Sequence, residues 1–397
     1  MTSDAVDGAR LGTVVVGGGP VGLTAALALA RRGHDVTVFE RDERPNTQWR
    51  ASTFHPPTLE MCAQLGVVDE MHRQGLVAPT YQLRDRAEGL IASFDFGTLA
   101  DATAYPHRLQ LEQYKYSAIL RDELAAFGRA PLAGRRVTGL RVGADGVELD
   151  LAGTRVRADR VIAADGARST VRTALGLDFA GLTYEHRYLL LSVDAPIEEH
   201  FPDICHVNYI ADPHEHLMLL RIPDLWRVMF EVHPQTGEGE ALSDAFVSAR
   251  LSSLLGEVSL DQVRSRQLYR VHQRVAESFR VGPVFLVGDA AHVNSPIGGM
   301  GLNSGIHDAY ELVVALDKGG DLDVWAQRRR RVASEEIQRI TDRNTKTLSY
   351  AEGEREHLDR VAALAADPAR ARDWVLEASM VSMARRHRLP VPCARVA

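Results

Sequence analysis

LGTVVVGGGPVGLTAALALARRGHDVTVFE, residues 11–40, carries the clearest indication of the fold in this chain. The β-branched and Ala/Leu-rich runs in it predict a buried strand, a buried helix and a second strand, at 11–16, 23–32 and 35–39. The pattern Gly17-x-Gly19-x-x-Gly22 separates the first strand from the helix, and Glu40 follows the second strand. Strand, glycine loop, helix, strand and acid in this order predict a dinucleotide-binding unit.

Each glycine of the pattern has its own mechanical role. Gly17 permits the tight turn, Gly19 lets the backbone approach a pyrophosphate, and Gly22 lets helix and strand pack closely. The free N–H groups and positive end of the helix favour phosphates, and Glu40 is suited to accept from ribose hydroxyls. This pattern leaves FAD and NAD(P) open as ligands, and a ligand-free glycine turn is the plain alternative.

Apolar periodicity predicts the other elements. Helices are expected at 58–65, 111–127 and 241–255, from about 301, and after Leu322. Short alternating runs predict a β-meander that returns to a buried strand, at 137–142, 147–151, 154–156 and 160–164. Further strands are expected at 80–95, 188–193, 206–210, 216–222, 226–232 and 284–287. The strands between 179 and 274 predict a second, mostly antiparallel region inserted into the first.

Composition bounds the function classes. The 397 residues hold 46 Lys and Arg against 53 Asp and Glu, a net charge of −7, which disfavours binding to nucleic acid or to an anionic membrane. No apolar run is long enough to span a bilayer or to act as a secretion signal, so a cytoplasmic protein is expected. Three scattered cysteines and the pair His214 and His216 lack metal-ligand spacing, so no metal is expected.

Three segments in this order resemble one family: residues 17–40, 164–172 (ADGARSTVR) and 288–303 (GDAAHVNSPIGGMGLN). Together they resemble the class A flavoprotein monooxygenases of the para-hydroxybenzoate hydroxylase type, over about residues 11–317. The resemblance implies an α/β fold with a Rossmann-like FAD-binding domain of the glutathione reductase type, an inserted, mostly antiparallel β-sheet substrate domain, and C-terminal helices. The expected segments are 1–78, 106–178 and 268–345 for the FAD domain, 79–105 and 179–267 for the substrate domain, and 346–397 for the C-terminal helices.

The resemblance also implies which residues hold FAD. The pyrophosphate and adenosine end would involve Gly17, Gly19, Pro20, Val21, Gly22, Glu40 and Arg41. Arg50, Gln113 and Asp165 would lie near the cofactor, and Asp289, after Gly288, would bind the ribityl chain. The isoalloxazine would lie along Pro296, Gly298, Gly299, Gly301, Leu302 and Asn303. A helix that starts there points its positive end at the flavin C2 carbonyl, where reduced flavin carries negative charge.

The implied activity is hydroxylation of a small phenolic or hydroxypyridine-like ring through a flavin C4a-hydroperoxide, with NAD(P)H and O2 as co-substrates. Two alternatives are a related flavin monooxygenase acting on a quinone precursor or an antibiotic, and a non-catalytic FAD-binding protein. Candidate substrate residues are His55, Tyr81, His206, Asn208, Tyr209, Met218, Arg221 and Pro296, and among them Arg221 is suited to a carboxylate. Alternation does not say which face of a strand points inward, and no catalytic base is assigned. A monomer or homodimer is expected.

Overall fold

The computed structural model describes residues 8–201, 203–256, 258–348 and 355–389. The strands are β1 Arg10–Val16, β2 Val36–Phe39, β3 Thr53–Phe54, β4 Leu76–Ala78, β5 Thr80–Asp85, β6 Gly89–Asp95, β7 Arg108–Gln110, β8 Val137–Gly143, β9 Gly146–Leu151, β10 Thr154–Ala163, β11 Phe179–Val193, β12 Val207–Ala211, β13 Leu217–Arg221, β14 Trp226–Val232, β15 Val263–Ala276, β16 Arg280–Val281, β17 Val284–Leu286 and β18 His292–Val293. They form sheets of seven, eight and three strands.

The α-helices within the same residues are α1 Pro20–Ala30, α2 Pro56–Gln64, α3 Val68–Gln74, α4 Gln113–Ala126, α5 Thr170–Ala174, α6 Ile197–His200, α7 Glu238–Ala241, α8 Asp244–Leu255, α9 Met300–Asp317, α10 Leu322–Arg331, α11 Gln338–Leu348, α12 Glu356–Ala365, α13 Pro368–Ala378 and α14 Val381–Arg386. A π-helical segment, Val332–Ile337, joins α10 to α11. No helix of the described residues is long and apolar enough to cross a membrane.

The opening stretch folds as expected. β1 pairs in parallel with β2 and with β10, and β17 continues the parallel set beyond β10. The helix α1 begins at Pro20, earlier than the apolar run suggested, because a proline suits the first helical position and lacks the N–H that would be unpaired there. Gly33 follows this helix with φ +77°, a left-handed conformation that favours glycine. The predicted Rossmann-like α/β class is confirmed.

Several expected boundaries differ from those observed; the strand expected at 188–193, for example, is the end of β11, which begins at Phe179. The last meander strand and the buried strand after it are one element, β10, whose first half pairs with β9 and whose second half pairs with β1. The helix expected at 241–255 is α8 and begins at Asp244, because the Ser243 hydroxyl caps it by accepting from Phe246 N at 3.2 Å; the short helix α7 precedes it and ends at Ala241.

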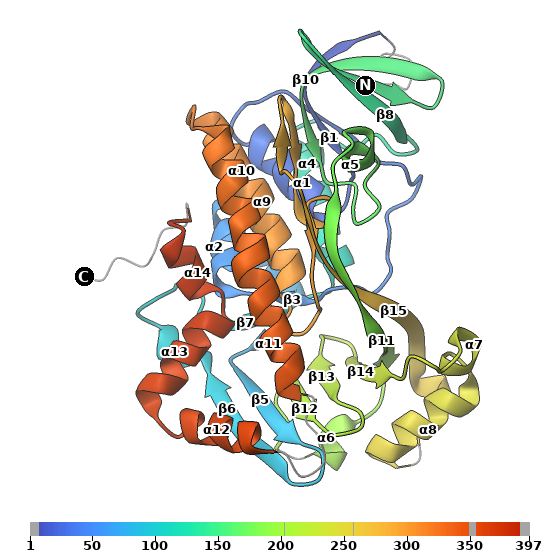
Figure 1. Ribbon diagram of the computed structural model, residues 1–397, viewed down its shortest axis with the longest axis vertical. Coiled ribbons are helices and arrows are strands. Elements are labelled where there is room, and N and C mark those ends of the chain that lie inside the picture. The colour runs from blue at the N-terminus through green and yellow to red at the C-terminus, as the bar shows by residue number, and fades with distance from the viewer. Residues whose placement is uncertain (1–7, 202, 257, 349–354, 390–397) are drawn as a thin grey trace.

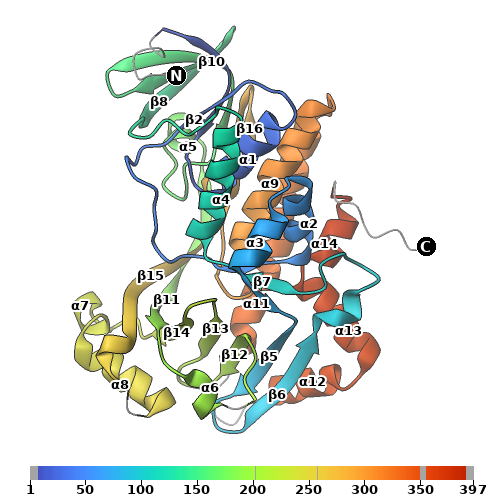
Figure 2. The same ribbon diagram turned by 180° about the vertical axis from the view of Figure 1, so that it is seen from behind.

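The eight-stranded sheet forms the lower part of the molecule (Figure 1). Its strand order is β18-β15-β11-β14-β13-β12-β5-β6, with neighbours antiparallel except β12 and β5. The long strands β11 and β15 belong to this sheet and extend from it toward the seven-stranded sheet that contains β1 (Figures 1 and 2). The helices α12 and α13 pack beside β6. β15 crosses the domain boundary expected at residue 268, and the exact domain boundaries stay predictions.

A buried ionic network ties α9 to α10 and to the end of β17. The Arg329 guanidinium, fully buried, pairs with Asp308 at 2.6 Å and with Glu311 at 3.0 Å. The Asp308 carboxylate also accepts from His292 Nε2 at 2.9 Å and from Gly288 N at 3.0 Å. The arginine and its hydrogen bonds hold the pKa of Asp308 below its usual range. The network therefore holds the turn that follows β17 against the long helix.

Arg329→Leu should lower the free energy of unfolding by about 3–5 kcal/mol, because it leaves buried carboxylates without their counter-ion. The matched control is Arg328→Leu, since Arg328 also pairs with Glu311 but its side chain is 32% exposed. That control should lose less than about 1 kcal/mol. Urea unfolding measures both values, and equal losses would contradict the importance of the buried pair.

Candidate active site

A cavity of about 980 Å³ lies where the carboxyl ends of the parallel strands face the eight-stranded sheet. This size is at the upper end of the range for ligand pockets. Residues from all three family-like segments line it, among them Gly17, Asp165 and Asp289. Parallel pairing places Val16, Ala163 and Leu286 side by side, so the turns after β1, β10 and β17 open onto one cavity.

The three glycines of the first turn differ in what surrounds them. A Cβ on Gly17 would lie 2.4 Å from Ala164 O, and a Cβ on Gly22 would lie 2.0 Å from Gly17 O. These two positions need glycine for the packing of the protein itself. A Cβ on Gly19 would meet nothing within 4 Å, because it would point into open cavity space. The backbone there is free for close approach by a ligand.

The Glu40 side chain packs against the glycine turn and stabilises it by hydrogen bonds. Its carboxylate accepts from Gly18 N at 2.6 Å and from Asp42 N at 2.8 Å. Arg121 of α4 donates to Gly18 O at 3.1 Å. Glu40 and Arg41 both line the cavity, so the acid shapes the turn while its remaining lone pairs face the open space.

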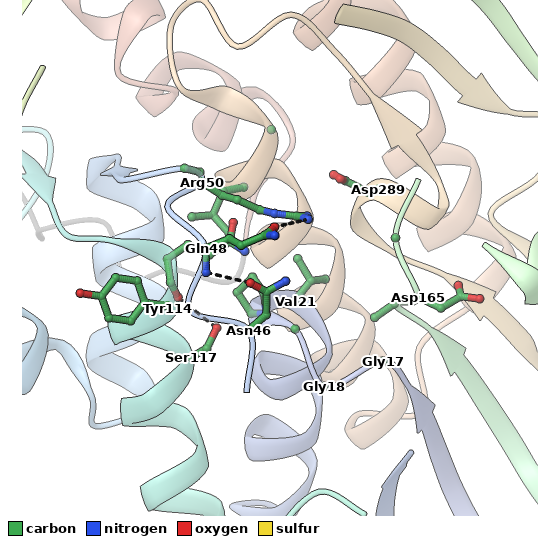
Figure 3. A pocket seen from close by; sticks show the side chains of 18 of the residues that line it. Gly17, Gly18, Val21, Asn46, Gln48, Arg50, Tyr114, Ser117, Asp165 and Asp289 are labelled. Atoms are coloured by element: carbon green, nitrogen blue, oxygen red, sulfur yellow. Dashed lines mark hydrogen bonds between the residues drawn. The ribbon is translucent and has the colours of Figure 1, made fainter. Parts of the chain in front are cut away.

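The segment that contains Arg50 forms another side of the cavity. Figure 3 shows the Arg50 side chain beside Gln48, to which its Nη2 donates at 3.3 Å. Gln113, the first residue of α4, lines the same side, and its N–H donates to Ala51 O at 2.9 Å. Arg50 and Gln113 thus line the same cavity, and their contact with FAD stays a prediction.

Two carboxylates at strand ends keep unused acceptor capacity. Asp165 accepts from Val171 N at 3.2 Å through Oδ2, while its buried Oδ1 has no partner among the described residues. Asp289 makes no hydrogen bond with the described residues, and its side chain opens into the cavity (Figure 3). Desolvation by the surrounding protein raises the pKa of both carboxyls, for Asp289 even though its side chain is exposed to the cavity. Such acceptors suit the hydroxyl groups of a ligand.

The glycine-rich third segment builds the wall between cavity and helix α9. Gly298 and Gly299 have φ of +104° and +67°, and the helix starts at Met300, one residue before the expected start. Pro296, Gly299, Gly301 and Leu302 line the cavity together with the helix N-terminus. The positive end of an 18-residue helix therefore faces the open space.

Four of the residues expected to hold FAD lie outside the cavity lining, namely Gly22, Gly288, Gly298 and Asn303. The buried Asn303 side chain accepts from His55 N at 2.9 Å and donates to Thr53 O and Gly299 O at 2.8 and 2.7 Å. The Asn303 amide thus connects residues 53–55 to the glycine-rich segment before α9. The other expected cofactor residues, Gly17, Gly19, Pro20, Val21, Glu40, Arg41, Arg50, Gln113, Asp165, Asp289, Pro296, Gly299, Gly301 and Leu302, line the cavity.

Of the eight substrate candidates, Met218 and Pro296 line this cavity. His55 is buried behind it, with Nε2 2.9 Å from Gly298 O, and its burial and the charge of Arg108 lower its pKa. His206 lies 3.0 Å from Val77 O through Nδ1, on the outside of the sheet. Tyr81 and Tyr209 line a second, smaller cavity.

Asn208 and Arg221 have structural partners instead. The buried Asn208 amide donates to Cys205 O at 2.7 Å and to Leu219 O at 3.3 Å. Arg221 lies 3.5 Å from the Glu198 carboxylate and over the ring of Trp226. The structure does not bring either side chain to the cavity, so Arg221 is not placed to receive a carboxylate there.

The sequence did not predict most of the cavity lining that the eight-stranded sheet provides, which is called the sheet wall below. This wall is apolar at its centre, with Leu190, Met229 and Leu220 beside Met218. Arg227, Gln267 and Tyr269 complete it. The alternation of these strands marked residues that share a face, but only the packing of the sheet on the third segment shows which face is inward.

The residues present fit FAD. The glycine turn with its open Gly19 and the α1 N-terminus suit a pyrophosphate. Asp165 and Asp289 offer acceptors farther along the cavity, and the wall from Pro296 to Leu302 offers backbone without side chains at two glycines. An elongated ligand with phosphates at one end and a flat ring at the other matches the order of these surfaces along the cavity.

Gly19→Ala should leave the fold intact and weaken FAD binding by at least about tenfold, because the new methyl group occupies the space of the pyrophosphate. The backbone of Gly19, at φ −78° and ψ 179°, accepts any residue. Gly239→Ala is the control, since a Cβ there also meets nothing within 4 Å. Flavin titration and thermal unfolding of the apoprotein give the two readouts; unchanged FAD affinity would place the pyrophosphate elsewhere.

Asp289→Ala should also weaken FAD retention by about tenfold, because the lost carboxylate is a charged acceptor for a hydroxyl group. Asp145→Ala, in the exposed turn between β8 and β9, should leave retention unchanged. Gel filtration followed by the flavin absorbance of the protein peak compares the two. Equal retention in both variants would mean that Asp289 does not contact the cofactor.

Comparison with known proteins agrees with this site. The chain is 35% identical to para-nitrophenol 4-monooxygenase of Pseudomonas sp. strain WBC-3, over 77% of each chain. It is 30% identical to 6-hydroxy-3-succinoylpyridine 3-monooxygenase of Pseudomonas putida, over 91% of this chain and 95% of the relative. The crystal structure of p-nitrophenol 4-monooxygenase from Pseudomonas putida DLL-E4 superposes with a TM-score of 0.88, at 30% identity, covering 94% and 98% of the two chains.

The family model described as "FAD binding domain" matches residues 10–338. This range contains all three glycine- and aspartate-bearing turns that open onto the cavity. The relatives named above are monooxygenases, which excludes the reading as a non-catalytic FAD-binding protein. The chain belongs to the FAD binding domain family, and it is a flavin-dependent monooxygenase.

Proposed function

We propose that this enzyme hydroxylates a small phenolic or hydroxypyridine-like ring that lies between Pro296 and the sheet wall of the large cavity. The observation that carries the proposal is the composition of that cavity. Its one end consists of glycine turns and carboxylates, and its other end is an apolar floor of Leu190, Met218 and Met229. A ring stacked on this floor would lie next to the wall along which the flavin is expected.

The protein positions the aromatic ring, excludes water from it and places positive partial charge beside the flavin. When bound, FAD supplies the redox chemistry with NAD(P)H and O2. The apolar floor excludes water from the face of the ring, which protects a reactive oxygen species from decay. The N-terminus of α9 places positive partial charge beside the wall, where it stabilises negative charge on a reduced flavin. No described side chain is assigned as the catalytic base.

The substrate class rests on the relatives together with the floor. Two relatives are named for p-nitrophenol and for 6-hydroxy-3-succinoylpyridine, both single aromatic rings with a hydroxyl group. The alternative substrate class, an antibiotic or its precursor, is supported by relatives named 6-methylpretetramide 4-monooxygenase and rifampicin monooxygenase, at 33% and 32% identity. We also propose a cytoplasmic monomer or homodimer.

The purified enzyme should be yellow, and the right substrate should accelerate NAD(P)H oxidation with formation of one hydroxylated product per NAD(P)H. A panel of phenols, hydroxypyridines and polyketide aromatics, scored by product as well as by NAD(P)H consumption, separates hydroxylation from peroxide release. Hydroxylation of polyketides alone would favour the alternative class. NAD(P)H oxidation that yields peroxide with every compound would contradict the proposed substrates.

A further inference from the structure

A second cavity lies next to the flavin wall and has not been assigned a role. Its volume is about 50 Å³, and it is lined by aromatic and aliphatic side chains together with Arg108. Ile297 and Gly298 border it, while their neighbours Pro296 and Gly299 border the large cavity. The wall of the flavin site therefore has one cavity on each side.

Arg108 is a buried cation to which none of the described residues supplies an anion. Its side chain is 2% exposed, and no described carboxylate lies within ion-pair distance of its guanidinium. Nη2 donates to Ala378 O at 3.2 Å, Nη1 is 3.4 Å from Tyr209 Oη, and Nε has no partner. Most of the five N–H donors of an arginine are thus unused.

Aromatic rings replace part of the missing counter-charge. The guanidinium lies 4.7 Å from the ring centre of Tyr81 and 5.1 Å from that of Phe96. Cation–π contacts recover only part of the cost of burying an unpaired ion. By contrast, the buried Arg84 pairs with Asp203 at 2.9 Å, and the buried Arg329 has two carboxylate partners. Arg108 is therefore poised for an anion from outside the chain.

The two cavities share one face of the eight-stranded sheet. Met218 lines the large cavity and is paired in register with Tyr209, which lines the small one. Neighbouring strands lie about 4.8 Å apart. The Met218 and Tyr209 side chains therefore lie on the same face of the sheet, so the linings of the two cavities are one strand spacing apart at this point.

The size of the small cavity suits a substituent and not a whole ring. A water-sized group requires about 10–15 Å³, so 50 Å³ holds about three to five such groups. A carboxylate has three non-hydrogen atoms, and its planar pair of oxygens matches the fork of a guanidinium.

We propose that the cavity around Arg108 is an anion subsite, which receives a carboxylate-sized anionic substituent of the aromatic substrate whose ring lies in the large cavity. The inference rests on the proposed function, because it assigns this ring to the same enzyme. It transfers to Arg108 the carboxylate role expected from the sequence for Arg221. The substrate class becomes a hydroxylated aromatic ring with an acidic substituent.

Calorimetric titration of the FAD-loaded enzyme with matched acids and amides tests this subsite. The probes are 4-hydroxybenzoate against 4-hydroxybenzamide, and 4-hydroxyphenylacetate against its amide. The acids should bind at least about tenfold more tightly than the amides, as expected for a charge-assisted hydrogen-bonded pair. Arg108→Gln should abolish this preference and leave the affinity for the amides nearly unchanged.

Arg227→Gln is the matched control, since Arg227 is also buried, lacks an ion-paired carboxylate among the described residues, and lines the large cavity instead. This variant should keep the preference for acids. Loss of the preference in Arg227→Gln and not in Arg108→Gln would overturn the proposal, as would acids that bind no better than amides to the unchanged enzyme.

Stability gives a second readout. Because Arg108 carries an unpaired buried charge, Arg108→Gln should unfold at the same temperature as the unchanged enzyme or higher, and added 4-hydroxybenzoate should raise that temperature only where Arg108 is present. A large loss of stability together with a persistent preference for acids in Arg108→Gln would show a purely structural arginine. Calorimetry needs no turnover, so failure of hydroxylation in the substrate panel would not be mistaken for failure of the subsite.

Discussion

Parallel pairing of β1 with β10, and of β10 with β17, positions every other part of the site. It places Val16, Ala163 and Leu286 at one edge of a sheet, although more than a hundred residues separate each from the next. Each strand ends in a turn that carries glycine or aspartate, so a glycine turn suited to phosphates and two carboxylates open onto the same space. The cavity exists because the strands end together.

Asp308 takes part both in the buried ionic network and in the positioning of the turn that carries Asp289. Its carboxylate accepts from the backbone of Gly288, the residue before Asp289, and is balanced by the buried Arg329. Gly288 has φ +59°, and a Cβ there would crowd Val21 of α1. The turn that presents Asp289 is therefore held by α9 and α10 from one side and by α1 from the other.

Charge is distributed unevenly along the face that the two cavities share. The floor under the expected ring is apolar, whereas Arg108 and Arg227 are buried cations at its two ends. Such cations cost stability in a protein that only needs to fold, since neither has a carboxylate partner among the described residues. For Arg108 the proposed ligand supplies the anion, whereas the Arg227 guanidinium donates to Ser52 Oγ at 3.1 Å and to the carbonyl oxygen of Arg50.

Local sequence patterns were enough to predict the nucleotide-binding half of the fold. The strand, glycine turn and helix of residues 11–30 were predictable because periodicity and backbone freedom act over a few residues, and the three turns at 17, 165 and 289 were recognisable as motifs. The tertiary structure alone decided the substrate side. Tyr81, Tyr209 and Arg108 come from three strands distant in sequence, and alternation gives each strand two equivalent faces. Only the packing of the eight-stranded sheet against residues 296–299 breaks that equivalence, which is why Arg221 lies away from the cavities and Arg108 lies in one.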